Sequence, residues 1–222
     1  MNMAMNIIKE NSSLEMDKTA KLFDVWANTG RSEDMEKGHG TTVNQFLDKL
    51  SLKENFTFLD IGCGNGWVVR KISQKLSCIK AVGIDKSKMM IKNAKSKTLS
   101  EKENYLVTDL ETWHTKEKFD VIFSMESLYY SVPMESALAK VFKLLKKNGV
   151  FYCGTDFYSD NHLTTRWVKD MNIPMDLRSE KEWKQMFRNV GFVTRSKHVI
   201  DQKNKSKWKR EFGTLFVIGR KA

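Results

Sequence analysis

Three glycines alternate with other residues directly after an apolar segment that contains an acid. The run Phe58-Leu-Asp-Ile-Gly-Cys-Gly-Asn-Gly-Trp67 places glycines at 62, 64 and 66, and Asp60 lies just before them. Glycine lets the backbone turn sharply here and approach a ligand closely, because a side chain would collide. The dinucleotide fingerprint would need its third glycine at position 67, where this chain has Trp. The spacing therefore disfavours a pyrophosphate cradle.

Two further acids follow apolar segments downstream. Asp85 ends the run Ala81-Val-Gly-Ile-Asp85, and Asp109 lies in Val107-Thr-Asp-Leu110. A carboxylate at the end of the second strand of such a unit can accept hydrogen bonds from both hydroxyls of a ribose. Asp109 could accept one from an exocyclic amino group, and the backbone N–H of Leu110 lies beside it. Together with the glycine turn, these acids predict a nucleoside site.

In the order and spacing of these segments, the chain resembles the class I S-adenosylmethionine-dependent methyltransferases of the small-molecule type. The resemblance is close over residues 55 to 155 and implies S-adenosyl-L-methionine as cofactor and S-adenosyl-L-homocysteine as product. By this resemblance Asp60, Gly62 and Gly64 would face the methionine part, Asp85 the ribose, and Asp109 with Leu110 the adenine. The run Asp85-Lys-Ser-Lys-Met-Met90 resembles the family's acid, serine and methionine pattern, so that Met90 would pack on the adenine. Cofactor contacts are also expected from Cys63, Lys86 and Ser124.

The segment Ser124-Met-Glu-Ser-Leu-Tyr-Tyr130 would lie at the carboxyl end of the sheet, where open α/β folds bind substrates. Relatives that methylate amino groups of bases carry Asn or Asp, two prolines and an aromatic residue there, and this chain does not. It also lacks the Pro-Cys pair that attacks a pyrimidine ring. We expect Glu126 and Tyr129 to be catalytic and Tyr130 to contact the substrate. The alternative for the tyrosines is packing under the following helix.

The N-terminal segment from Trp26 to Gly40 combines an aromatic residue, an arginine, a histidine and three glycines. We expect Trp26 and Arg31 to contact the cofactor, with the Arg31 fork pairing with a carboxylate of the cofactor or substrate. His39 could serve as a proton acceptor near neutral pH. The alternative for His39 is a residue at a helix start that is bonded to the backbone.

Residues 156 to 178 form a long insertion after the fifth predicted strand and would cover the same end of the sheet. We interpret the insertion as a substrate lid. Asp156, Tyr158 and His162 are its candidate substrate contacts, and ordinary loop packing is the alternative for each. We expect His114 and His198 to be exposed and without a partner.

Short apolar runs alternate with amphipathic stretches, which predicts a parallel sheet of the Rossmann-like α/β class with helices on both faces. The predicted strands cover residues 56–61, 81–84, 105–107, 121–124 and 150–153. A capping box at Ser179 and Glu182 opens a helix that reaches Gly191. Strands at 192–200 and 212–218 then form an antiparallel hairpin, which gives seven strands. At the N-terminus, helices at 14–27 and 41–50 flank a loop.

One domain is expected over residues 1–222. It comprises a helical N-terminal cap (1–54), a cofactor-binding core (55–155), the lid (156–178) and a C-terminal helix with its hairpin (179–222). The 222 residues, 41% of them hydrophobic and 29% charged, can fill a core and exclude a disordered or fibrous chain. No apolar run approaches the roughly 18 residues of a membrane span, and no signal peptide is evident. We therefore expect a cytoplasmic protein with no membrane partner.

The three cysteines, Cys63, Cys78 and Cys153, are odd in number and widely spaced within apolar segments. This pattern fits neither a disulfide framework nor a metal-ligand spacing. We expect three buried free thiols and no metal.

The predicted function is methyl transfer to a small-molecule acceptor by in-line displacement. One alternative is methylation of RNA or another macromolecule, based on the net charge of +11 and on the basic run 203–210, whose Trp208 could stack on a base. We favour a solvated hairpin turn for this run, since lysine dominates over arginine in it. A non-enzymatic nucleoside-binding module is a second alternative. A nicotinamide oxidoreductase is disfavoured by the glycine spacing and the hairpin, and the sequence makes no prediction of oligomeric state.

Overall fold

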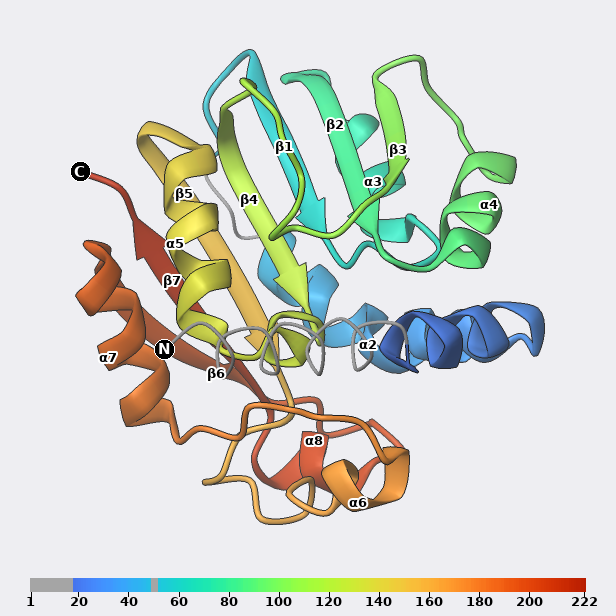
Figure 1. The fold of residues 1–222 in the computed structure, drawn as a ribbon, viewed down its shortest axis with the longest axis vertical. Coiled ribbons are helices and arrows are strands. Elements are labelled where there is room, and N and C mark those ends of the chain that lie inside the picture. The colour runs from blue at the N-terminus through green and yellow to red at the C-terminus, as the bar shows by residue number, and fades with distance from the viewer. Residues whose placement is uncertain (1–17, 49–51) are drawn as a thin grey trace, which may run out of the picture.

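The computed structural model describes residues 18–48 and 52–222. Its centre is a seven-stranded sheet with the strand order β3-β2-β1-β4-β5-β7-β6 (Figure 1). The strands are β1 (Phe56–Ile61), β2 (Cys78–Asp85), β3 (Glu103–Val107), β4 (Phe119–Met125), β5 (Leu145–Thr155), β6 (Val193–Val199) and β7 (Thr214–Arg220). Neighbours among β1 to β5 pair in parallel, whereas β7 is antiparallel to both β5 and β6. The predicted seven-stranded sheet with its C-terminal hairpin is confirmed.

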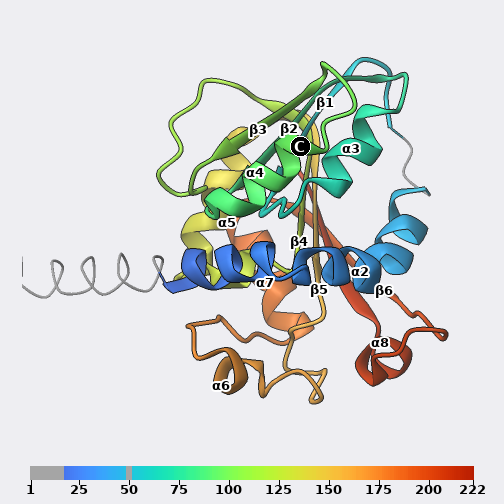
Figure 2. The same ribbon diagram turned by 90° about the vertical axis from the view of Figure 1, so that its right-hand side faces the viewer.

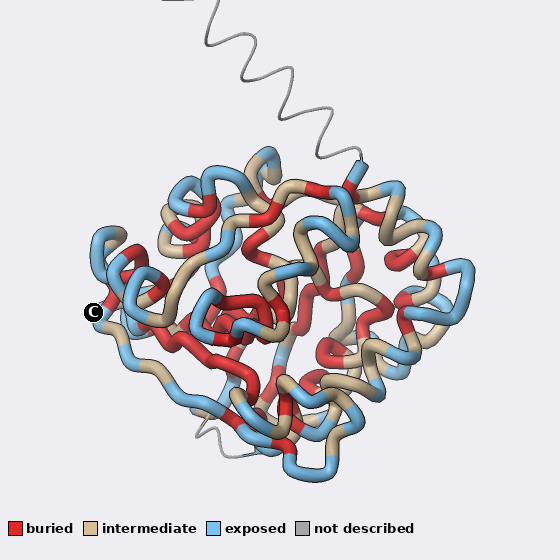
Figure 3. The backbone as a smooth tube through the Cα atoms, turned by 90° about the horizontal axis from the view of Figure 1, so that it is seen from below, coloured by how far each residue is buried: buried red, intermediate tan, exposed pale blue. Residues whose placement is uncertain are grey.

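Helices cover both faces of this sheet because its central strands are apolar on both sides. In β4 every residue except Met125 is buried. One core cluster lies between the sheet and the helices α5 (Met134–Leu144) and α7 (Glu180–Val190), and the other lies against α2 (Arg31–Leu47), α3 (Trp67–Ser73) and α4 (Lys88–Ser96). The buried residues gather along the inside of the molecule, and exposed stretches surround them (Figure 3).

The N-terminal helices cross the carboxyl ends of the strands. A helix over residues 18–28 lies beneath β3 and α4, and α2 continues from it beneath β1 and β4, as Figures 1 and 2 both show. Residues 14–17 and 49–50 of the two predicted helices lie outside the described residues. None of the described helices is both long and apolar enough to cross a membrane.

The predicted loop between these helices is wrong, because α2 already begins at Arg31. Gly30 has a φ of 78° and separates the two helices. Burial explains the helix despite Gly38 and Gly40, since its buried residues recur with helical spacing from Ser32 through Val43 to Leu47. Tertiary packing of this face outweighs the low helix propensity of the two glycines.

The basic run 203–210 connects β6 and β7 and is exposed at Lys203, Lys205 and Lys207, as predicted for a solvated turn, but its last part differs from that prediction. It contains part of the short helix α8 (Lys207–Glu211), and Lys209 is only 2% exposed. Trp208 lies edge-on against Trp167, with ring centroids 5.5 Å apart. The difference arises because Lys209 forms an internal ion pair with Asp156.

The insertion 156–178 packs below the strand ends together with α8 (Figure 1). It contains the helix α6 (Trp167–Met171), and Phe157 and Tyr158 at its start are fully buried. The Asn161 amide and the Thr164 hydroxyl both donate hydrogen bonds to the Asp156 carbonyl at 2.9 Å. These contacts fix the point at which the insertion leaves β5.

Candidate active site

The turn between β1 and α3 depends on glycine. Gly62 has a φ of 69°, and a Cβ at this position would lie 1.9 Å from the Ser127 Oγ atom. Gly66 has a φ of 79°, and its Cβ would lie 2.6 Å from the Tyr105 ring. Only glycine avoids both the strained conformation and the collision. The local sequence therefore forces a turn whose backbone lies open along one wall of a pocket.

Asp85 at the end of β2 fastens this turn to the start of α4. Its Oδ2 atom accepts a hydrogen bond from the Gly64 backbone N–H at 2.9 Å, and its Oδ1 atom accepts one from the Ser87 N–H at 2.8 Å. Burial raises the pKa of the Asp85 carboxyl group. Each carboxylate oxygen keeps further lone pairs for a ligand, so Asp85 can hold the turn and bind at the same time.

Asp60 has no such support from the protein. It is 3% exposed and lines the same pocket, and no described residue donates a hydrogen bond to its carboxylate. Burial, and secondarily the negative charge of Asp85, raise the pKa of Asp60 well above its usual range. Two desolvated carboxylates on one pocket wall favour a ligand that carries positive charge.

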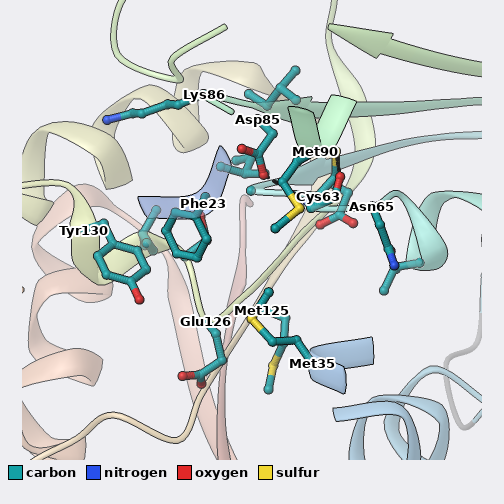
Figure 4. Close-up of a pocket in the computed structure, with 18 of the residues that line it drawn as sticks. Phe23, Met35, Cys63, Asn65, Asp85, Lys86, Met90, Met125, Glu126 and Tyr130 are labelled. Carbon is teal, nitrogen blue, oxygen red and sulfur yellow. Dashed lines mark hydrogen bonds between the residues drawn. The ribbon is translucent and has the colours of Figure 1, made fainter. Parts of the chain in front are cut away.

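A single pocket brings together most of the predicted cofactor contacts. Lining it are Asp60, Gly62, Cys63, Gly64, Asp85, Lys86, Met90, Asp109 and Leu110. Asp109 forms an ion pair with Lys86 at 3.0 Å between Oδ2 and Nζ. Figure 4 shows Cys63, Asp85 and Met90 gathered at one end of the pocket. The cysteines at 63, 78 and 153 are buried and free, which confirms that prediction.

Three other predicted cofactor residues do not line this pocket. The Arg31 guanidinium lies 3.8 Å from the centroid of the Trp26 ring, so the two side chains stack on each other. Ser124 is fully buried in β4. Residues that were not predicted from the sequence also line the pocket, among them Thr19, Phe23, Met35, Glu36, Asn65 and Met125. One pattern in the sequence could have indicated part of this set, because one helical face of α2 carries Ser32, Met35, Glu36 and His39.

Glu126 lies at the other end of the pocket, close to Met35 and Met125 (Figure 4). One of its carboxylate oxygens accepts a hydrogen bond from the Asp156 backbone N–H, and the other accepts one from the Tyr129 hydroxyl at 2.9 Å. Burial, and then the nearby negative charge of Asp156, raise the pKa of Glu126 to about 8. Such a carboxylate is a stronger base than an exposed one.

The two tyrosines after Glu126 have different places. Tyr129 is 2% exposed and does not line the pocket, which it reaches only through its hydrogen bond to Glu126. Tyr130 does line the pocket, and its ring lies edge-on against Phe23 with centroids 5.3 Å apart. The helix over residues 18–28 thus closes one side of the chamber around Glu126.

A buried network of charges lies behind this chamber. The Asp156 Oδ2 atom is 2.6 Å from the Lys209 Nζ atom, and the Asp156 Oδ1 atom accepts a hydrogen bond from the Thr214 hydroxyl at 2.6 Å. Although burial favours the neutral acid, the Lys209 ammonium and these contacts lower the pKa of Asp156. His39 lines the pocket and lies 3.1 Å from Lys209, measured from Nδ1 to Nζ.

The remaining candidates from the insertion lie away from the pocket lining. The buried Tyr158 donates a hydrogen bond from its hydroxyl to the Phe212 carbonyl at 3.1 Å. His162 is exposed, and its ring lies edge-on to Phe212 at 4.8 Å. His198 is exposed as predicted, but it has a partner, since its Nε2 atom lies 2.9 Å from the Glu180 Oε2 atom. In the described residues, no three of the His, Cys, Asp and Glu side chains form a group that could hold a metal ion.

Comparisons with known proteins agree with this geometry. Residues 33–197 match a family model described as a methyltransferase domain. A viral protein named "Putative methyltransferase 235L", from Invertebrate iridescent virus 6, is 27% identical over 74% of this chain and 58% of its own length. The sterol 24-C-methyltransferase of Candida albicans is 28% identical over 72% of this chain and 46% of its own. The chain thus spans about half the length of these curated relatives.

Among solved structures, this chain is similar to one in the Haloferax volcanii complex between the Trm112 methyltransferase activator and a methyltransferase candidate. The TM-score is 0.84 and the identity 27%, over 89% of this chain and 96% of that one. The family match covers well over half of the 222 residues. The chain therefore belongs to the methyltransferase domain family and has the fold of solved S-adenosylmethionine-dependent methyltransferases.

Proposed function

We propose that this protein transfers a methyl group from S-adenosylmethionine to a small-molecule acceptor by in-line displacement. The observation that carries the proposal is one continuous pocket with two different ends. Asp85 lies at one end with Asp60 near it, and Glu126 and Tyr130 lie toward the other (Figure 4). His39 is 3.8 Å from Asp156, whose backbone N–H donates to Glu126. A pocket whose two ends differ in this way can hold a charged cofactor at one end and an acceptor at the other.

The cofactor end fits the charges of S-adenosylmethionine. This molecule carries an ammonium and a sulfonium cation, and its sulfonium supplies the methyl group. The unpartnered Asp60 carboxylate would bind the ammonium, and Asp85 would bind the ribose. Met90, with the Lys86 and Asp109 pair, would hold the adenine. Among the described lysines and arginines, only Lys86 lines the pocket. The positive charges of the cofactor itself would therefore offset the negative charges of Asp60 and Asp85.

The acceptor end supports positioning and proton removal. Met35, Met125 and Tyr130 form largely apolar walls that exclude water and align the acceptor with the departing sulfur. Glu126 faces this space and is the candidate proton acceptor for a hydroxyl group, because its pKa of about 8 lies near the working pH. An acceptor that arrives without a proton on the reacting atom needs no base.

Two features favour a small acceptor over RNA. The helix over residues 18–28 closes the chamber with Phe23, which leaves less room for a macromolecule. The basic run 203–210 turns Lys209 inward and packs Trp208 against Trp167, so the aromatic ring between the cations is already engaged. A relative named for sterol methylation is in keeping with apolar chamber walls.

The test is transfer of labelled methyl from S-adenosylmethionine into a cell extract that is separated by molecular size, with and without nuclease treatment. Label in the low-mass fraction supports the proposal. Label in nuclease-sensitive material contradicts the small acceptor, and absence of label in every fraction contradicts methyl transfer. Asp85→Asn should lower the transfer, whereas Asp170→Asn, an exposed change in α6, should leave it unchanged.

We also propose that the protein assembles with an activator of the Trm112 type. The support is the similarity to a Haloferax volcanii chain that was solved together with such an activator. Co-expression of the two proteins followed by size-exclusion chromatography tests this. Co-elution at a stoichiometric ratio is the expected result, and separate elution at micromolar concentrations would contradict the assembly.

A further inference from the structure

We infer that Lys209 fixes His39 as a hydrogen-bond donor toward the acceptor, and that the acceptor group is therefore an uncharged hydroxyl. The position of the His39 proton follows from the contacts of Lys209 alone, whereas the choice of a hydroxyl acceptor rests on the proposed methyl transfer. The two residues belong to the opposite ends of the chain, in α2 and α8. They meet at the wall of the pocket, where His39 is a lining residue.

Three acceptor atoms surround the buried Lys209 ammonium group. Its side chain is 3% exposed, and its Nζ atom lies 2.6 Å from Asp156 Oδ2, 3.1 Å from His39 Nδ1 and 3.3 Å from Thr214 Oγ1. An ammonium group has three N–H donors and no acceptor. The Thr214 hydroxyl donates its own hydrogen to the Asp156 Oδ1 atom, so its oxygen is able to accept from Lys209. The contacts with His39 and Thr214 thus require Lys209 to donate, and the ion pair with Asp156 holds the ammonium in place.

The position of the His39 proton follows from this. A nitrogen that accepts a hydrogen bond carries no proton, so Nδ1 is unprotonated and the neutral ring has its proton on Nε2. No described residue forms a hydrogen bond with Nε2. Burial, and then the positive charge of Lys209, lower the pKa of His39 to about 4, so the ring gains no second proton near neutrality. His39 is therefore a donor and not a base.

The other charged groups around His39 do not reverse this result. Asp156, which follows β5, lies 3.8 Å from His39 Nδ1, and its negative charge favours protonation of His39. The ion pair with Lys209 offsets this charge. Glu126 comes from the end of β4 and is raised in pKa, so near pH 7 much of it is uncharged. Glu36, one turn earlier in α2, accepts a hydrogen bond from the Asn65 amide and faces Arg70.

A fixed donor on the chamber wall selects the chemistry of the acceptor. A hydroxyl oxygen has two lone pairs, so one can accept from His39 Nε2–H while the other attacks the methyl group. An amine nitrogen has one lone pair and cannot do both, and a carboxylate would need a cation that Lys209 no longer offers. The hydroxyl oxygen forms the new bond to carbon, the old carbon–sulfur bond breaks with its electron pair on sulfur, and the proton passes to the Glu126 carboxylate.

The tautomer of His39 can be measured without any activity. Long-range ¹H–¹⁵N spectra of protein with ¹⁵N-labelled histidine distinguish the two ring nitrogens, and the His39→Asn spectrum identifies His39 among the four histidines. We expect an unprotonated Nδ1 and a protonated Nε2 at pH 7. In Lys209→Met the cation is lost while Asp156 remains, so His39 should become protonated at Nδ1 as well. A protonated Nδ1 in the unsubstituted protein would overturn the inference.

Two further variants keep this test informative. Lys207→Met lies on the same short helix with a 62% exposed side chain and should leave the His39 signals unchanged. The double variant Asp156→Asn with Lys209→Met removes both charges of the buried pair and serves if Lys209→Met alone does not fold. His39 should then populate both neutral tautomers. An unchanged tautomer in the double variant would show that Lys209 does not set it.

The hydroxyl preference is tested with two probes of matched shape, 4-hexylphenol and 4-hexylaniline, each added to the protein together with S-adenosylhomocysteine. The phenol should shift the His39 Nε2–H signal clearly, because its oxygen keeps a lone pair in the ring plane that accepts a hydrogen bond. The aniline should shift it much less, because its single lone pair is delocalised into the ring. Replacing His39 by Leu should weaken phenol binding by about 10-fold, as loss of one hydrogen bond predicts. No shift with phenol, or an equal shift with aniline, would overturn the acceptor assignment. A phenol shift without methyl transfer would contradict the proposed function alone.

Discussion

At the scale of single residues, Asp85 carries the clearest prediction for cofactor binding. Its carboxylate holds the glycine turn through Gly64 and can still accept from a ligand. Asp85→Asn replaces one acceptor by a donor, and it should weaken S-adenosylhomocysteine binding by about 1.5 to 3 kcal/mol. Isothermal titration calorimetry measures this, with His39→Leu as the control that keeps its affinity. Equal affinity in Asp85→Asn and in the unsubstituted protein would refute the ribose assignment.

Glu126 predicts how the rate depends on pH. Only the ionised carboxylate can accept a proton, and its pKa is raised to about 8, so kcat for a hydroxyl acceptor should rise as the pH increases through this value. In Glu126→Gln this rise should disappear and the rate should fall about 100-fold or more, within the range for loss of a general base. A pH–rate profile between pH 6 and 10 measures both effects. A rise that persists in Glu126→Gln would assign the proton transfer to another group.

Some residues of the site could be predicted from the sequence and others could not. Asp60, Gly62, Gly64 and Asp85 could be predicted, because a turn that admits only glycine and acids at strand ends leave a local pattern. Lys209 could not, since in the sequence it is one lysine in a basic run, and only the fold places Asp156 beside it. Long-range ion pairs of this kind have no signature in local spacing.

At the scale of elements, the glycines of α2 give a prediction about stability. A Cβ on Gly40 would meet nothing within 4 Å, and its backbone is helical. Gly40→Ala should stabilise the fold by about 0.5 to 1 kcal/mol, because alanine loses less backbone entropy in a helix. Thermal unfolding should then show a rise in Tm of roughly 1 to 4 °C.

Gly30 supplies the matched comparison for Gly40. Its φ of 78° is a left-handed conformation in which a side chain is strained, although no atom lies within 4 Å of its Cβ position. Gly30→Ala should therefore lower Tm while Gly40→Ala raises it. Similar effects of the two substitutions would contradict the helix boundary at Gly30.

The elements that could be predicted share a strong local pattern. Buried strands such as β1 and β4 are short apolar runs, and α7 has its capping box at Ser179. The start of α2 was missed because the helix-breaking glycines dominate its sequence, whereas its stability comes from packing against distant strands. The helix α8 could not be predicted for a different reason, because five residues are too few for a periodic signal.

At the scale of the whole molecule, stability should depend on pH in two opposite ways. The pKa of His39 is lowered to about 4 in the folded protein from 6.5 in the unfolded chain, so its contribution is present above pH 6.5 and is lost as the pH falls to about 4. The pKa of Glu126 is raised to about 8 from 4.5, so its contribution is present below pH 4.5 and is lost as the pH rises to about 8.

Between pH 4.5 and 6.5 these two slopes oppose each other, and substitution of either residue should reveal the other. In His39→Asn the urea midpoint of unfolding should fall more steeply with rising pH than it does in the unsubstituted protein. In Glu126→Gln it should fall less steeply than in the unsubstituted protein, or rise. Parallel profiles for the two variants would mean that neither group titrates as its burial indicates.

The contact between His39 and Lys209 joins positions that are 170 residues apart, and it orders events during synthesis of the chain. Strands β1 to β4 leave the ribosome well before α8, so the cofactor wall can form on the nascent chain first. The acceptor wall has to wait for residue 209, because until then Asp156 has no cation and His39 has no fixed proton. A nascent chain can therefore acquire its methyl donor site before it gains any means of choosing what to methylate.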